Sequence, residues 1–209
     1  MSHSNNFERN AFVNCPFDKE YEPLLQAILF TLVRFGLRPR ISSETNDSGE
    51  SRLERILELI QSSRFAIHDL SRFKAKQEGE IYRMNMPFEL GLDIGCRRFG
   101  SGRLAQKRTL VLEEQRYQYQ KSLSDLAGCD IDAHDGDFMI AVRKVRNWFS
   151  GIGGFEEVAA ARVLADYEDF QHWHLRQQKG IGSSEDDISD YSTSELLRSM
   201  FKWSRERES

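Results

Sequence analysis

The sequence has few of the residues that mark several familiar functional classes. It contains three cysteines in 209 residues. That number is odd, and Cys15, Cys96 and Cys129 do not have the spacing of metal ligands. No apolar run is long enough for a membrane-spanning helix, and the N-terminal segment lacks the apolar stretch of a signal peptide. We therefore expect reduced thiols, no metal site, no membrane segment and a cytoplasmic location.

Positive charge and catalytic histidine patterns are also scarce. The formal net charge of −4 provides no long-range attraction for nucleic acid, so a nucleic-acid partner is not expected. The basic pair Arg97-Arg98 is expected to be solvated surface. The five histidines show no catalytic pattern, and we expect His68 to be buried structure. Neither a P-loop nor a dinucleotide-binding glycine motif is present.

Strand patterns alternate with helix patterns over the first 150 residues. This order predicts an α/β fold, with a parallel sheet of about five strands and helices on both faces. We assign residues 1–150 to this domain. The expected strands are 11–15, 37–42, 64–69, 108–113 and a short one near 130–131. The expected helices are 18–36, one from 51, one that carries Glu89, 118–126 and 138–149.

A glycine-rich break at 150–154 precedes a predicted helical C-terminal extension, residues 151–209. We expect a long helix over 155–178, a polar linker at 180–187 and a final helix with capping-box spacing between Ser192 and Glu195. The final helix has an apolar stripe: Leu196, Leu197, Met200, Phe201 and Trp203. The stripe predicts either packing onto the sheet domain or an interface. An interface would bind a second copy of the chain or an activating protein partner.

Parallel sheets bind ligands beyond the carboxyl ends of their strands. Arg72 could hold a phosphate there, and Asp69 could bind ribose hydroxyls or orient Glu89. Gly49 would let the backbone approach a ligand closely. The other expected ligand-binding residues are polar or small side chains near strand and helix ends: Asn14, Cys15, Ser48 and Asn85.

The segment 85–95 is the most informative stretch of the chain. Asn85 is predicted to cap a helix, with Pro87 in its first turn, which places the Glu89 carboxylate near the positive end of the helix dipole. Gly91 and Gly95 leave one helix face bare, and we expect that face to lie close against the sheet. Apolar neighbours predict that Glu89 is buried, and a buried ionisable group usually has a partner or a task. The simpler alternative is that Glu89 only complements the helix dipole.

The order of elements, the strand that ends in Asp69 and the run Pro87-Phe88-Glu89-Leu90-Gly91 resemble the nucleoside 2-deoxyribosyltransferase-like group, over about residues 10–149. That group shares a flavodoxin-like layout with TIR domains. The resemblance implies that Glu89 is the essential glutamate and that Asp69 is the aspartate after the third strand. It also implies cleavage or transfer at a sugar–base bond, with NAD among TIR substrates, and a role in antiphage defence. No metal or bound organic cofactor is implied.

Cleavage of an N-ribosidic bond builds positive charge on the sugar, and a fixed carboxylate such as Glu89 lowers that barrier. The sequence offers no convincing acid to protonate a leaving base. Nicotinamide leaves NAD as a neutral molecule, so an NAD-hydrolysing N-glycosidase is the first hypothesis. The alternatives are a non-catalytic module that senses a nucleotide, a nucleoside deoxyribosyltransferase and an adaptor protein.

Overall fold

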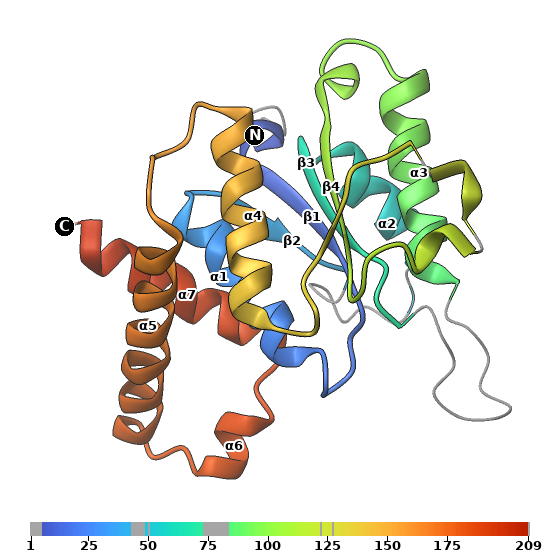
Figure 1. Ribbon diagram of the computed structural model, residues 1–209. Coiled ribbons are helices and arrows are strands. Elements are labelled where there is room, and N and C mark those ends of the chain that lie inside the picture. The colour runs from blue at the N-terminus through green and yellow to red at the C-terminus, as the bar shows by residue number, and fades with distance from the viewer. Residues whose placement is uncertain are drawn as a thin grey trace, which may run out of the picture.

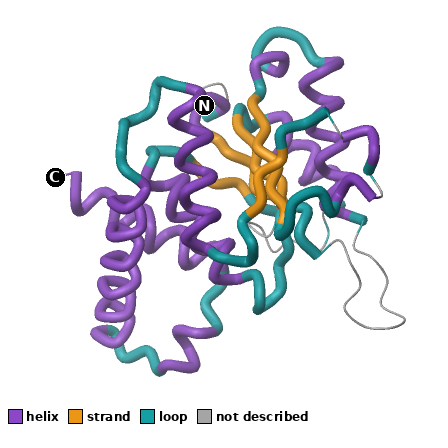
Figure 2. Tube along the Cα trace, viewed as in Figure 1, coloured by secondary structure: helices purple, strands orange, loops and turns teal. Residues whose placement is uncertain are grey.

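The computed structural model describes residues 6–42, 49, 51–72, 84–121, 123–126 and 128–208. Its centre is one parallel sheet in the order β2-β1-β3-β4-β5, which is the flavodoxin-like order and confirms the expected fold class (Figure 2). The chain reverses its winding direction between β1 and β3, and ligands bind such folds at this point. The strands are β1 (Asn10–Asn14), β2 (Arg38–Arg40), β3 (Phe65–Asp69), β4 (Arg108–Glu113) and β5 (Ile131–Ala133).

Helices cover both faces of the sheet (Figure 1). One face packs against α1 (Glu22–Arg34) and α4 (Phe138–Ile152), and the other against α2 (Arg52–Gln61) and α3 (Asn85–Phe99). Every residue of β1 and β3 is buried, as is usual for strands with helices on both sides. Because side chains alternate along a strand, odd-numbered residues of β1 and β3 contact the α1 and α4 side.

The C-terminal extension consists of α5 (Ala160–Gly180), α6 (Glu185–Ser189) and α7 (Thr193–Glu208). Its aromatic residues pack around Phe30 of α1, whose ring centroid lies 5.2 Å from that of Tyr167 and 5.1 Å from that of Trp203. The α7 stripe is buried in the same core, at Leu196, Leu197, Met200 and Trp203. Packing onto the sheet domain is therefore confirmed for this stripe. An oligomer or an activating partner stays a prediction.

The boundaries of the C-terminal helices agree in part with those expected from the sequence. Ser192 and Glu195 form the expected capping box, with Ser192 N donating to Glu195 Oε2 at 2.9 Å and Glu195 N donating to Ser192 Oγ at 3.3 Å. The glycine-rich break begins later than expected, because α4 continues to Ile152. The chain then turns at Gly153 and Gly154, whose φ values are +76° and +79°.

The expected helix over 118–126 is wrong. The segment forms only two short 3-10 turns, Tyr119–Lys121 and Ser124–Leu126. Just before these turns, the buried Glu113 carboxylate accepts hydrogen bonds from the backbone N–H of Tyr117 (2.7 Å) and of Gln118 (3.2 Å). These bonds close the loop after β4, in which Tyr117 adopts a left-handed φ of +66°. Two further 3-10 turns are Phe7–Arg9 and Leu104–Gln106.

Across the described ranges, none of the helices combines the length and the apolar content that a bilayer crossing requires.

Replacing Met200 by alanine tests whether α7 belongs to the core. Met200 is fully buried, so we expect Met200→Ala to lower the free energy of unfolding by about 2–4 kcal/mol. Urea unfolding followed by tryptophan fluorescence measures the change. The exposed Arg198 on the same helix is the control, and Arg198→Ala should change that free energy by less than about 0.5 kcal/mol. An unchanged midpoint for Met200→Ala would show that α7 does not stabilise the fold.

Candidate functional site

Three buried groups meet at the carboxyl ends of β1 and β3. Cys15 follows β1, Asp69 is the last residue of β3, and Glu89 lies in the second turn of α3. Burial raises the pKa of the Cys15 thiol well above its usual value, and the nearby charges of Asp69, Glu89 and Asp18 raise it further. The thiol is therefore protonated at neutral pH. Asp69 and Glu89 therefore both lie close enough to Cys15 for their charges to act on its thiol.

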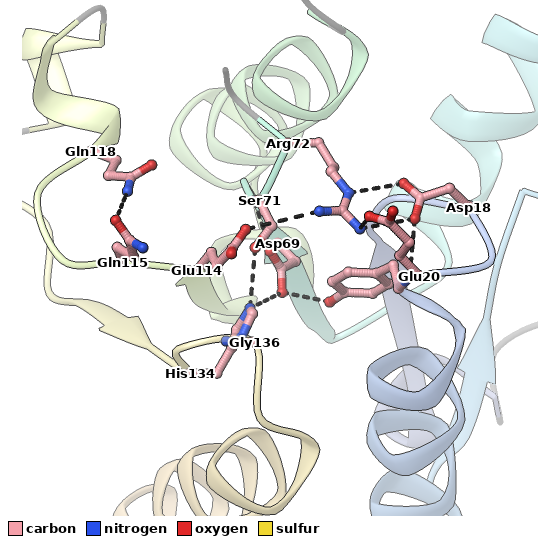
Figure 3. Close-up of polar contacts among 11 residues, drawn as sticks. Asp18, Glu20, Asp69, Ser71, Arg72, Glu114, Gln115, Gln118, His134 and Gly136 are labelled. Atoms are coloured by element: carbon pink, nitrogen blue, oxygen red, sulfur yellow. Dashed lines mark hydrogen bonds and ion pairs between the residues drawn. The ribbon is translucent and has the colours of Figure 1, made fainter. Parts of the chain in front are cut away.

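The Asp69 carboxylate is fully buried and has hydrogen-bond partners at both oxygens (Figure 3). Oδ1 accepts the backbone N–H of Ser71 at 2.8 Å, and Oδ2 accepts the hydroxyl of Tyr21 and lies 2.9 Å from His134 Nε2. Burial alone would raise the pKa of Asp69. The contacts with His134, Ser71 and Tyr21 outweigh burial and hold that pKa below its usual value. Asp69 is therefore a fixed anion.

Ser71, His134 and Asp69 are not a serine-nucleophile triad. The backbone N–H of Gly136 donates to His134 Nδ1 at 3.1 Å, so in the neutral ring the proton is on Nε2. That same Nε2 lies 3.1 Å from Ser71 Oγ and 2.9 Å from Asp69 Oδ2. A triad needs the carboxylate at one ring nitrogen and the hydroxyl at the other. His134 therefore orients Asp69 and is not placed to activate Ser71.

Glu89 has a different environment. Its side chain is only 5% exposed, yet it accepts no hydrogen bond from any residue that the structure describes, and its ion-pair neighbour is Arg52, with Nη2 at 3.8 Å from Oε1. Burial raises the pKa of Glu89 to about 7, which the charge of Arg52 offsets only in part. Glu89 is thus buried as its neighbours predicted, and it is about half protonated at neutral pH.

Asp69 does not orient Glu89 directly. Between these two described residues the structure contains no hydrogen bond or ion pair. Asp69 contacts Tyr21, which immediately precedes α1, and His134, which follows β5, so it belongs to the α1 and α4 face of the sheet. Glu89 belongs to α3 on the opposite face. The two carboxylates reach the crevice from opposite faces of the sheet.

The N-terminus of α3 differs from the prediction in two ways. Met84 is the N-cap and no side chain caps the helix, while Asn85 is exposed as the first helical residue. The bare glycine face does not lie against the sheet either, because Gly91 is exposed and a Cβ there would meet nothing within 4 Å. The buried positions of α3 are instead Met86, Glu89, Leu90 and Asp93.

Arg72 is not free to hold a phosphate. Its guanidinium donates to Asp18 from Nε and Nη2, each at 3.0 Å, and to Glu20 at 3.0 Å (Figure 3). Glu114 lies 4.0 Å from Nη1. Three carboxylates therefore compensate one positive charge. Arg72 instead joins the loop before α1 to the ends of β3 and β4, and it does so from a left-handed φ of +72°.

The other residues that were expected to contact a ligand, and are not yet placed, are Asn14, Gly49 and Ser48. Asn14 is buried, and its amide nitrogen lies 3.0 Å from His68 Nδ1 and donates to the Met86 carbonyl at 2.9 Å, so it holds α3 against β1. Gly49 is exposed. Ser48 lies outside the described residues.

Tyr21 and His134 were missed by the sequence analysis, whereas the turn that Asp69 caps at Ser71 is the simpler role that its position after β3 suggested. His134 directly follows β5, so extending the strand-end argument to the fifth strand would have found it. Backbone strain marks the same edge of the sheet. The three non-glycine residues with positive φ in the described ranges are Arg72, Tyr117 and Asp135, which follow β3, β4 and β5. Such strain often accumulates at functional sites.

A buried ion pair anchors α3 one turn beyond Glu89. Lys107 Nζ lies 3.0 Å from Asp93 Oδ1, and both side chains are fully buried. Lys107 also donates to the Ile60 carbonyl at 2.7 Å, and Thr109 donates to Asp93 Oδ2 at 2.8 Å. Burial would raise the pKa of Asp93, but His68, whose Nε2 lies 3.4 Å from Oδ2, and Lys107 hold it at about 2. The helix turns on both sides of Glu89 are thus fixed, by Asp93 and by the bond from Asn14 to Met86.

Replacing one partner of this ion pair should destabilise the fold more than replacing both partners with apolar residues. Lys107→Met leaves Asp93 as an uncompensated buried charge, so we expect the free energy of unfolding to fall by about 3–5 kcal/mol. The double variant Lys107→Met/Asp93→Leu should recover most of that loss, because no charge is then left unpaired. Urea unfolding of the single and double variants measures both effects. Equal losses in the two variants would contradict the buried ion pair.

Comparisons of this chain with protein-family models, with curated proteins and with solved structures find no match. Within the described residues, no group of three histidine, cysteine, aspartate or glutamate side chains is placed to hold a metal ion. The resemblance to the nucleoside 2-deoxyribosyltransferase-like and TIR-like group therefore stays a prediction.

Proposed function

We propose that the crevice between the ends of β1 and β3 cleaves the N-glycosidic bond of a nucleotide, with ionised Glu89 as the catalytic group and NAD as the first substrate to test. The observation that carries this proposal is that no described residue donates a hydrogen bond to Glu89. Four other buried carboxylates, those of Asp69, Asp93, Glu113 and Asp166, all accept hydrogen bonds. A buried carboxylate that is left unsatisfied costs stability, and such groups concentrate at functional sites.

The bond cleavage needs one anion at the sugar. The bond between C1′ and the base nitrogen breaks, the electron pair leaves with the nitrogen, and positive charge develops on the sugar ring. The Glu89 carboxylate stabilises that charge or attacks C1′ directly. Water then supplies the hydroxyl group at C1′ and releases a proton. With NAD the departing nicotinamide is neutral, so this route needs no acid to protonate the base.

Burial increases the electrostatic effect of Glu89. A charge in a site with little water interacts more strongly with developing charge, and a group that is already held in place needs no reorganisation. The two carboxylates have different roles in this proposal, one structural and one catalytic. Asp69, whose pKa is lowered and whose oxygens are engaged, holds the loops in position, while Glu89, whose pKa is raised and which accepts no hydrogen bond from the described residues, acts on the substrate.

The direct test is release of free base from NAD, ATP, nucleosides and deoxynucleosides, followed by chromatography. We expect nicotinamide release from NAD, reduced at least about 100-fold in Glu89→Gln, because this variant keeps the shape and loses the charge. Glu58→Gln, at an exposed position of α2, is the control and should keep full activity. Because the active form is the carboxylate, the rate should rise with pH through about 7 and then level off.

Three results would contradict the proposal. The first is base release that persists in Glu89→Gln. The second is a rate that falls as pH rises through 7, because Glu89 would then act as an acid. The third is tight nucleotide binding without turnover at high protein concentration, which would identify a sensing module.

A further inference from the structure

A groove is lined in part by α3. Figure 1 shows α3 on the side of the sheet opposite to α5 and α7. Its volume is about 660 Å³, within the usual size of small-ligand sites. Residues of α3, of the loop that follows it, of β4 and of the segment before β5 line it. The apolar part of the lining is Leu90, Ile94, Ala105 and Val111.

The floor of the groove belongs to the folded core. Leu90 and Val111 are buried and pack in one cluster with Leu70, Met86 and Tyr119. Ile94 is a large apolar side chain that is 39% exposed beside that floor. The groove is therefore a preformed apolar surface, and it is separate from the crevice that contains Cys15 and Asp69.

Two arginines that form no ion pair with the described residues stand at this groove. Arg97 and Arg98 line it from the last turn of α3, both are exposed, and neither makes an ion pair or hydrogen bond with any part of the chain that the structure describes. Several other arginines are paired with carboxylates, such as Arg34 with Asp166 and Arg72 with Asp18. Cations suit the C-terminal end of a helix dipole. The dipole does not explain why both line an apolar groove.

The charges around the groove limit the kind of ligand. On a chain with net charge −4, two adjacent arginines beside an apolar floor complement a single anionic group attached to an apolar body. Asp130 also lines the groove, and its carboxylate would repel a second anionic group. A polyanion such as nucleic acid is therefore disfavoured.

We propose that this groove is a second binding site, which takes an organic monoanion with an apolar body. Arg97 and Arg98 bind the anionic group, and the floor formed by Leu90 and Val111 holds the body. This site does not depend on the activity proposed for Glu89.

Two probes with the same ring systems test the two parts of the site separately. The parts are the two arginines, which bind the anionic group, and the apolar floor, which holds the rings. 1-Anilinonaphthalene-8-sulfonate carries a sulfonate, and N-phenyl-1-naphthylamine lacks it. We expect one equivalent of the sulfonate to bind, and Arg97→Gln/Arg98→Gln to weaken its binding at least about tenfold without changing the binding of the neutral probe. Arg103→Gln is the matched control, because Arg103 stacks over the Phe7 ring outside the groove lining. Circular dichroism and thermal unfolding confirm that each variant is folded.

The exposed thiol of Cys129 reports where the probe binds. Cys129 lines the groove, whereas Cys15 is buried and Cys96 is partly buried. The bound sulfonate should slow maleimide alkylation of Cys129 several-fold, measured by peptide mass spectrometry, and this protection should disappear in Arg97→Gln/Arg98→Gln. Sulfonate binding that the double variant does not weaken, or that leaves Cys129 unprotected, would overturn the proposal. Glu89→Gln should not change either readout, so this site and the proposed activity can fail separately.

Discussion

The site depends on how the fold satisfies the buried charge of Asp69. This carboxylate ends a central strand with no exposure to solvent, and an unpaired charge there would be very costly. Its partners come from three parts of the chain: Tyr21 before α1, Ser71 after β3 and His134 after β5. Satisfying one carboxylate therefore fixes three loops around the crevice. Arg72 adds further bonds from the end of β3 to the loop before α1, through Asp18 and Glu20.

The opposite face of the sheet is held in the same manner by Asp93. Lys107, His68 and Thr109 compensate it, and through it they fix α3. Glu89 lies on that helix between two fixed turns, yet it lacks the compensation that Asp69 and Asp93 have. A helix held this firmly can carry an unsatisfied carboxylate without moving it toward water. The raised pKa of Glu89 is the direct consequence of that arrangement.

Local patterns predicted much of this architecture. The expected strand over 108–113 agrees with β4 at both ends, and the burial of Glu89 follows from its apolar neighbours. Predictions failed where a distant or polar partner decides the structure. The bonds from Glu113 to the backbone of the loop after β4, and the interactions of Asp18 and Glu20 with Arg72, cannot be inferred from spacing. The contact between Asp69 and His134 joins residues 65 positions apart, which no local pattern reveals.

The measurement that tests this account most directly is the titration of the Glu89 side-chain carboxyl group by ¹³C NMR. Comparison of the wild-type spectrum with that of Glu89→Gln assigns the resonance. We expect a midpoint near pH 7, because burial without a hydrogen-bond donor among the described residues disfavours the charged form. A midpoint near 4.5, the ordinary value for a glutamate, would show that Glu89 is solvated or satisfied, and would remove the basis for its proposed role.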